Sequence, residues 1–173
     1  MIFRRLALFL CLMFSLAEGE EMHLTSSAFN QDGAIPSVYT CEGAGYNPPL
    51  EITGIPAAAK SLVLIMDDPD VPSYIREDQL WVHWVVYDIP PSTKKIAENS
   101  TPPGTVGKGT GMKAIYDGPC PPDRKHRYFF KLYALNVQLH LHKGATKEEV
   151  EEAMEGHILA QTQLMGTYEK KKK

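Results

Sequence analysis

The most constraining feature of this chain is a series of short apolar segments separated by clusters of proline and glycine. Residues 61–66 form an uninterrupted apolar run between Pro56 and Pro69, which is too short for a helix and fits a buried strand. Residues 80–89 and 126–135 are rich in aromatic and β-branched side chains, the composition that strands favour. We therefore expect the core to be built mainly from strands.

One helix is predicted after these strands. Thr146 and Glu149 make a capping box, the paired hydrogen-bonding signature of a helix start. Gly166 is then a natural stop for the helix. The side chains between them that fall on one 3.6-residue stripe are Val150, Ala153, Met154, His157, Ile158, Gln161 and Met165.

The order of the predicted elements sets the fold class. A short strand over residues 51–55 precedes the longer strands, and residues 99–122 form a long loop crowded with glycine and proline. A strand-rich chain with one late helix argues against a doubly wound parallel sheet. We expect a mostly β fold with α, in one domain over residues 20–173.

Residues 1–19 have the pattern of a secretory signal peptide. Arg4 and Arg5 give a basic start, residues 6–16 are apolar but too short to span a bilayer, and residues 17–19 supply small residues for cleavage. We therefore expect a secreted or periplasmic protein with no membrane span once the signal is removed.

The cysteine count leaves two states open. Loss of Cys11 with the signal peptide leaves Cys41 and Cys120, an even pair that fits one disulfide in an exported chain. Two unpaired thiols are the alternative, because the sequence does not report the distance between them.

Polar chemistry gathers at three places beside the predicted strands. The first is residues 67–72, with sequence DDPDVP, directly after the run 61–66. Prolines fix the backbone beneath the carboxylates, although the same residues also make a good turn. Three carboxylates so close together raise the pKa of at least one of them unless cations or hydrogen-bond donors lie nearby.

The second place is the predicted strand around His83. Period-two alternation puts Trp81, His83, Val85 and Tyr87 on one face. His83 is then the polar residue in an apolar neighbourhood. It is either a core histidine with satisfied hydrogen bonds or a ligand-binding group, and this segment alone does not decide between them.

The third place is the rigid turn 118–122, with sequence GPCPP, which leads into His126, Arg127 and Tyr128. On a strand, His126 and Tyr128 share one face and Arg127 takes the other. The imidazole and the phenol are donors, and Arg127 can hold a carboxylate with two hydrogen bonds. An aspartate of residues 67–70 is a natural partner for it, and an exposed arginine at a strand end is the alternative.

Together these motifs resemble the phosphatidylethanolamine-binding protein family, in its bacterial, Raf-kinase-inhibitor-like branch. The resemblance rests on the order and spacing of Asp68-Pro69-Asp70-x-Pro72, His83 in a Trp-flanked strand, the turn 118–122, and His126-Arg127-Tyr128, and it runs from about residue 23 to 165. It implies antiparallel β-sheets in a Greek-key arrangement with flanking helices. It also implies a small surface pocket that accepts phosphate, acetate or a phosphoethanolamine head group.

Further roles are expected from the chemistry of single residues. Arg127 is expected to be structural and to orient an aspartate, and backbone N–H groups of the 104–111 loop or of the Gly118 turn are expected to add donors. We predict that Asp68 or Asp70 accepts one ring N–H of His83 or His126, so that the other ring nitrogen donates to the anion. Two features depart from the family pattern: Asn47 stands where many members have serine before the Pro-Pro motif, and the charged insertion 73–79 is expected at the pocket rim. The ligand-binding residues that the resemblance implies are Asp68, Asp70, Pro72, His83, His126 and Tyr128.

The preferred functional hypothesis is a binding protein for a small anion or a phosphorylated ligand, with no catalytic residue, cofactor or metal. One alternative is a kinase or protease inhibitor that acts through a protein partner. The other is a metal-dependent or acid/base hydrolase that uses the same histidines and aspartates. A net charge of -3 lacks the basic footprint of a nucleic-acid binder. The resemblance is compatible with a homodimer, although no residue pattern demonstrates one.

Overall fold

The computed structural model describes residues 21–171, so the predicted signal peptide over residues 1–19 lies outside the described residues. Within that range, no helix is long and apolar enough to cross a membrane. The elements in chain order are β1 (His23–Thr25), the 3-10 helix η1 (Ser37–Tyr39), β2 (Leu50–Thr53), β3 (Ser61–Asp68), β4 (Trp81–Ile89), β5 (Lys95–Ile96), β6 (Thr105–Val106), β7 (His126–Leu135), α1 (Lys147–Met154) and β8 (Ile158–Tyr168).

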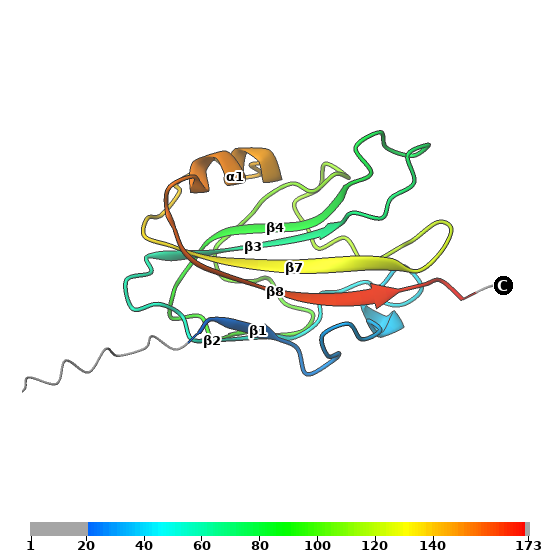
Figure 1. The fold of residues 1–173 in the computed structure, drawn as a ribbon, viewed down its shortest axis with the longest axis horizontal. Coiled ribbons are helices and arrows are strands. Elements are labelled where there is room, and N and C mark those ends of the chain that lie inside the picture. Colours follow the sequence, from blue (N-terminus) through cyan, green and yellow to red (C-terminus); the bar gives the residue numbers. More distant parts are fainter. Residues whose placement is uncertain (1–20, 172–173) are drawn as a thin grey trace, which may run out of the picture.

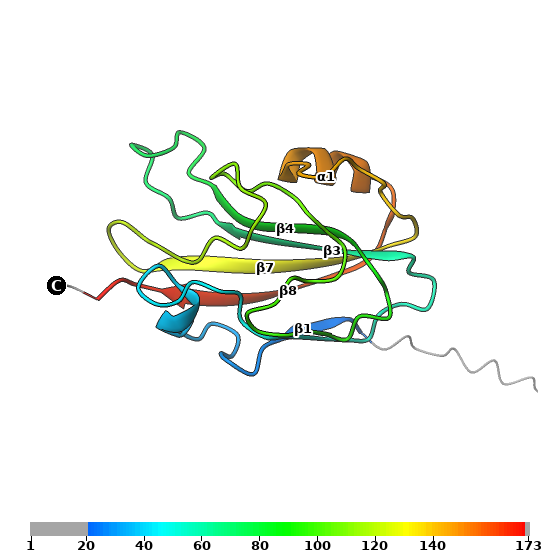
Figure 2. The ribbon, with the colours of Figure 1, turned by 180° about the vertical axis from the view of Figure 1, so that it is seen from behind.

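Two antiparallel sheets and the helix α1 lie in three layers (Figure 1). The small sheet has the strand order β1-β2-β5, and the large sheet has the order β6-β4-β3-β7-β8. Seen from behind, the small sheet lies below the large sheet, and α1 lies above it (Figure 2). After β6 the chain crosses back to place β7 beside β3, a non-local return typical of Greek-key connections. The predicted mostly β fold with antiparallel sheets is confirmed.

The central strand β3 is buried on both faces. Leu62, Leu64 and Met66 point into a core between the two sheets, which we call the inter-sheet core. Val63 and Ile65 point to the opposite face, into a smaller core beneath α1, which we call the helix-side core. An uninterrupted apolar run suits a strand that has a hydrophobic layer on each side, and the predicted buried strand is confirmed.

β4 carries a β-bulge at His83. Met66 of β3 pairs with Trp84, and Asp67 pairs with Val82, which leaves His83 without a partner on β3. A bulge inserts one extra residue into a strand and changes the direction in which a side chain points. The bulge lies where the last residues of β3 pair with the first residues of β4, and the polar residues gather at the same place.

The bulge overturns the predicted alternation of β4. Val85 and Tyr87 pack in the helix-side core. His83 instead packs its ring against Tyr128, which belongs to the inter-sheet core. The prediction that His83 shares a face with Val85 and Tyr87 is therefore wrong, because an inserted residue breaks the period of two.

The predicted start of the helix is confirmed, but its predicted end is wrong. Its capping box is present, since the Glu149 N–H donates to the Thr146 hydroxyl and the Thr146 N–H donates to the Glu149 carboxylate. However, α1 ends at Met154, and Gly156 then takes a positive φ of 75° that reverses the chain. The positions expected on the C-terminal half of the helical stripe belong to β8, which pairs with β7 along its length.

Gly166 is not a helix stop, as predicted, but a close-packed strand position. It lies opposite Tyr128 in the β7–β8 ladder. A Cβ atom there would come within 2.6 Å of Ile35 and 2.8 Å of Phe29. The glycine therefore lets residues of the inter-sheet core approach the β8 backbone.

Candidate functional site

A small cleft opens where the end of β3, the start of β4 and the start of β7 meet the loop before β7. Its volume is about 170 Å³. Carboxylates and imidazoles lie together here with a largely apolar wall. The lining residues are Asp68, Val71, Ile75, Trp81, His83, Asp117, Gly118, Cys120, Pro121, Pro122 and His126.

A larger hollow than this cleft lies elsewhere. It is a groove of about 710 Å³ along residues 52–59, and Pro91 and Lys94 close its other side. Its only ionisable side chain is Lys94, so it holds no carboxylate or imidazole that could form a metal ligand set. We therefore take the smaller cleft, which gathers the titratable groups, as the candidate site.

His83 is held at the cleft by two hydrogen bonds to one residue. Its ring Nδ1 lies 2.6 Å from the backbone carbonyl oxygen of Asp117, and its own carbonyl accepts from the Asp117 N–H at 2.9 Å. A carbonyl oxygen only accepts, so Nδ1 must carry the hydrogen and Nε2 is the titrating nitrogen. No hydrogen bond from residues 21–171 reaches Nε2. Burial lowers the pKa of His83, so the ring is neutral near pH 7.

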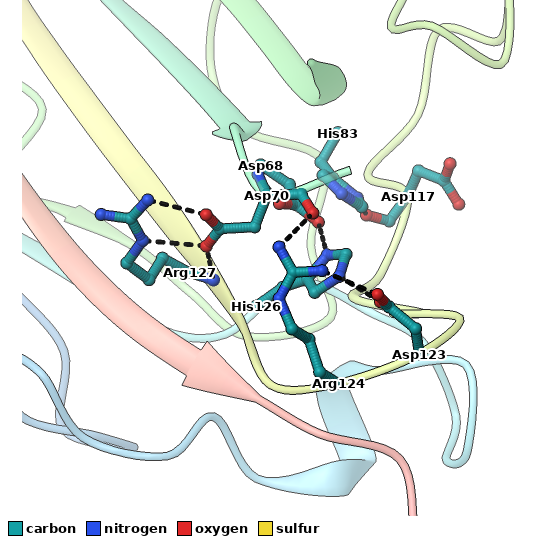
Figure 3. Close-up of polar contacts among 8 residues, drawn as sticks. All are labelled: Asp68, Asp70, His83, Asp117, Asp123, Arg124, His126 and Arg127. Atoms are coloured by element: carbon teal, nitrogen blue, oxygen red, sulfur yellow. Dashed lines mark hydrogen bonds and ion pairs between the residues drawn. The ribbon is translucent and has the colours of Figure 1, made fainter. Parts of the chain in front are cut away.

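His126 lies between two carboxylates (Figure 3). Its Nδ1 is 2.7 Å from the Asp68 carboxylate, and its Nε2 is 2.9 Å from the Asp123 carboxylate. Ionised carboxylates only accept, so the arrangement is satisfied by an imidazolium that donates from both nitrogens. The hydrogen bond from His126 holds the pKa of Asp123 below its ordinary value.

These contacts revise the predicted histidine mechanism. Asp68 does accept a ring N–H of His126, as predicted. The second ring nitrogen of His126 does not face the cleft, because Asp123 binds it. His83 keeps a nitrogen for a ligand, but a backbone carbonyl orients its ring, and neither Asp68 nor Asp70 does so.

Asp70 turns away from the cleft and binds Arg127. The two carboxylate oxygens accept from the guanidinium at 2.8 and 2.7 Å, and one of them also accepts from the Arg127 N–H at 2.9 Å. Arg124 adds a hydrogen bond to the Asp70 carbonyl oxygen, as Figure 3 shows. The hydrogen bond from Arg127 holds the pKa of Asp70 below its ordinary value. The expected pairing of Arg127 with an aspartate of the DDPDVP turn is confirmed.

The three carboxylates of Asp67, Asp68 and Asp70 bind three different partners in the fold. Each carboxylate lies beside its own basic side chain. The shortest contacts are 2.7 Å for Asp67 with Lys131, 2.7 Å for Asp68 with His126, and 2.7 Å for Asp70 with Arg127.

Tyr128 lies behind His83 and is not part of the cleft wall. It is fully buried, and its ring packs edge-on against the His83 ring with 5.3 Å between centroids. Its hydroxyl has no hydrogen-bond partner among the described residues. Burial and the nearby Asp68 carboxylate raise the pKa of Tyr128, so the phenol keeps its proton. The predicted contact of Tyr128 with ligand stays a prediction.

Pro72 also contributes indirectly. Its carbonyl accepts from the N–H groups of Ile75 at 2.9 Å and Arg76 at 3.2 Å. This turn brings Ile75, and not Pro72 itself, to the cleft wall. The expected place of the other residues of 73–79 at the rim stays a prediction.

The turn 118–122 forms the opposite wall and is tied to residues 39–41. Cys120 is joined to Cys41 in a disulfide with 5.4 Å between Cα atoms, and the Cys41 N–H donates to the Pro119 carbonyl at 3.1 Å. A Cβ atom on Gly118 would come within 2.8 Å of the Tyr39 carbonyl oxygen. Glycine is therefore needed for this close approach.

Sequence reasoning missed two aspartates of the site. Asp117 orients His83 through its carbonyl, and its carboxylate accepts from the Trp81 indole N–H at 3.2 Å. Asp123 closes the second side of His126. A backbone carbonyl leaves no signal in a residue pattern. The spacing of three between Asp123 and His126, after a proline pair, is the one local signal that could have pointed to their contact.

A metal site finds no support in the described residues. No three His, Cys, Asp or Glu side chains between residues 21 and 171 are placed to share a metal ion. The imidazole nitrogens of the cleft are instead bound by a carbonyl or by carboxylates, apart from Nε2 of His83.

Comparison with known proteins gives matches over most of the chain. The family model described as phosphatidylethanolamine-binding protein matches residues 25–169. A protein of Chlamydia muridarum, described as a UPF0098 protein, is 52% identical over 148 residues, which cover 86% of this chain and 99% of that protein.

Solved structures match as well. A crystal structure from Chlamydia trachomatis, described as a candidate homologue of phosphatidylethanolamine-binding protein, has a TM-score of 0.86 at 50% identity, covering 88% of this chain and 99% of that one. The crystal structure of Escherichia coli YbcL, described as a new member of the mammalian PEBP family, has a TM-score of 0.78 at 25% identity, covering 87% and 99%.

Proposed function

This chain belongs to the phosphatidylethanolamine-binding protein family, and we propose that its cleft binds a phosphoryl group through His83. The observation that carries the proposal is the state of the His83 ring. Asp117 occupies Nδ1, the imidazole is buried, and Nε2 is left for a ligand. His83 lines the cleft, and a ring nitrogen that has no hydrogen bond from the described residues is suited to binding a partner from outside.

The size and wall of the cleft favour a small ligand. A volume of about 170 Å³ is below the range of drug-sized pockets and suits a phosphoryl group with a short substituent, such as a phospholipid head group. Apolar residues such as Val71, Ile75 and Trp81 exclude water from one side. Exclusion of water strengthens each hydrogen bond inside the cleft.

The protonation of the site determines whether a proton must be taken up when the ligand binds. The Asp68 carboxylate is bound by His126 and by the Asp70 N–H, at 2.7 and 2.8 Å. The neutral His83 ring offers a lone pair at Nε2. Contact between Nε2 and a phosphoryl oxygen therefore needs one proton, which either the imidazole or the phosphoryl group carries. Binding is coupled to the uptake of that proton when both are deprotonated in solution.

The proposal includes an extracytoplasmic location, as predicted from residues 1–19. The disulfide between Cys41 and Cys120 is consistent with it, because disulfides persist in oxidising compartments. Intact-mass measurement of the exported protein without reductant tests both points. The expected mass lacks the signal peptide and two hydrogens.

Calorimetric titration with O-phosphorylethanolamine at pH 7 tests the proposed function. Wild-type protein should bind with a stoichiometry of one, and His83→Gln should weaken binding about ten- to hundredfold, because a charge-assisted hydrogen bond contributes about 1.5–3 kcal/mol. His142→Gln is the matched control, since that side chain is exposed and does not line the cleft. Equal affinity in wild-type and His83→Gln proteins would count against the proposal.

A further inference from the structure

A second hollow lies on the large sheet, over β7 and β8, and we call it the β7–β8 hollow. Its volume is about 280 Å³. None of its lining residues also lines the cleft, so the proposed function leaves all of them unused. The residues that line it are Lys131, Tyr133, Gln161, Thr162 and Gln163.

The pairing of β7 with β8, which run side by side in Figure 1, builds this hollow. Lys131 lies opposite Gln163, and Tyr133 lies opposite Gln161. Residues directly opposite each other on antiparallel strands point to the same face, and so do residues two apart on one strand. The four side chains therefore form one polar surface across two strands, and both glutamines are exposed.

The helix α1 leaves this surface open. Its buried side chains Val150 and Met154 pack in the helix-side core, mainly against residues of β3 and β4. Tyr133 packs at the border of that core and is only partly buried. Beyond Tyr133, the part of the face that β7 and β8 form remains accessible to solvent.

The charged groups beside the hollow compensate each other. The Lys131 ammonium lies 2.7 Å from the Asp67 carboxylate. The Lys147 ammonium lies 3.3 Å from the same carboxylate and 3.6 Å from that of Glu151. Two ammonium groups thus face two carboxylates, which favours a neutral ligand over an anion. An ammonium has three N–H donors, so Lys131 keeps donors beyond the one that Asp67 binds.

The other polar side chains of the hollow are free to bind a ligand. Within residues 21–171, the Tyr133 hydroxyl and the amides of Gln161 and Gln163 make no hydrogen bond to the protein. Each amide supplies a carbonyl acceptor and an NH₂ donor. Burial raises the pKa of Tyr133, so the phenol keeps its proton and both donates and accepts.

Tyr133 also supplies an aromatic ring. Phe129 lies on the same face of β7, but the Arg127 guanidinium and the Lys131 ammonium lie over its ring, at 5.7 and 5.9 Å from the centroid. Single-stranded nucleic acid needs successive stacking rings in a basic groove, which this charge-compensated face of β7 does not supply. One ring beside neutral donors and acceptors matches a sugar, which has an apolar C–H face and hydroxyl groups at its edge.

We propose that the β7–β8 hollow binds a neutral sugar. The sugar ring stacks on Tyr133, and its hydroxyl groups exchange hydrogen bonds with the two glutamine amides and with the Lys131 ammonium. A volume of about 280 Å³ lies just below the range of drug-sized pockets and suits one or two sugar rings. Because the hollow is open to solvent and the contacts are few, the expected Kd is roughly 0.1–1 mM.

A glycan array followed by NMR titration tests the proposal. Wild-type protein should bind at least one neutral oligosaccharide of hexose or N-acetylhexosamine units. In ¹H–¹⁵N spectra, that glycan should shift the side-chain amide signals of Gln161 and Gln163. The proposal is overturned if every neutral glycan fails to bind at about 10 mM, ten times the weakest expected Kd, or if acidic glycans bind more tightly.

Gln161→Ala is the principal test variant, because this exposed side chain lies outside both cores and its loss should leave the fold intact. It should weaken glycan binding about tenfold, since it removes the hydrogen bonds of one amide. Tyr133→Leu removes the stacking ring and should weaken binding at least as much. Gln138→Ala, which removes an exposed amide in the loop after β7, is the matched control and should bind as wild type does.

Circular dichroism checks the fold of each variant. Wild-type glycan affinity in Gln161→Ala would overturn the proposal, whether or not Tyr133→Leu folds. The proposed anion site is measured separately, because Gln161→Ala should bind O-phosphorylethanolamine as wild type does. O-phosphorylethanolamine should also leave the bound glycan in place, and displacement of the glycan would overturn the proposal by placing the sugar in the cleft.

Discussion

The most informative perturbation of the cleft is pH. Asp117 fixes the hydrogen of His83 on Nδ1, and burial lowers the pKa of this ring, so Nε2 is unprotonated in the free protein near and above pH 7. The second pKa of a phosphate monoester is about 6, so the ligand is then a dianion. Neither group carries the proton that their contact needs.

The magnitude follows from one missing proton. Above both pKa values, each unit of pH weakens binding about tenfold, or ~1.4 kcal/mol, because one proton must be taken from solution. Raising the pH from 7 to 9 spans two pH units and should therefore weaken O-phosphorylethanolamine binding about a hundredfold. Calorimetry at pH 8 in buffers of different ionisation enthalpy should report the uptake of close to one proton per ligand.

The controls separate His83 from other titrating groups. A glutamine amide needs no proton to donate, so His83→Gln should bind weakly and take up almost no proton. His142→Gln should keep the wild-type proton count. A wild-type affinity that does not change between pH 7 and 9, with no proton uptake, would refute the reasoning about the His83 ring.

Three further predictions concern the frame of the cleft. Asp70→Asn should lower the free energy of unfolding by about 1 kcal/mol at pH 7, since Arg127 is half exposed and solvent screens the pair. Because Arg127 lowers the pKa of Asp70, this difference should vanish as the pH falls through that pKa, which urea unfolding measures. Joint Cys41→Ser and Cys120→Ser substitution should cost about 4 kcal/mol in the same assay, given a separation of 79 residues, and unchanged stability would contradict the disulfide. Gly118→Ala should displace the turn from Tyr39 and weaken ligand binding about tenfold, given an overpacking cost of roughly 1–3 kcal/mol; calorimetry showing wild-type affinity would contradict it.

The parts of the fold that sequence predicted are those with a strong local signal. The apolar run 61–66 fits only a strand covered on both faces, and β3 is such a strand. The capping box at Thr146 marks the start of α1 because both of its hydrogen bonds are local. The opposite directions of His126 and Arg127 follow from the pleat of β7.

The parts that sequence missed depend on contacts between distant segments. β8 has residues at helical spacing, but the ladder with β7 satisfies its backbone, and Gly156 permits the reversal that brings it there. The bulge at His83 depends on the register between β3 and β4, which no single segment encodes. The role of Asp117 in the site was missed for a different reason. It orients His83 through its backbone carbonyl, and any residue type has that group.

The most direct test of the binding account is a crystal structure of this protein with O-phosphorylethanolamine. The account predicts a phosphoryl oxygen within hydrogen-bonding distance of Nε2 of His83, with the imidazole still donating to the Asp117 carbonyl and His126 still between its two carboxylates. A phosphoryl group bound outside the cleft, for example beside Lys94, or a His83 ring turned away from it, would contradict the account.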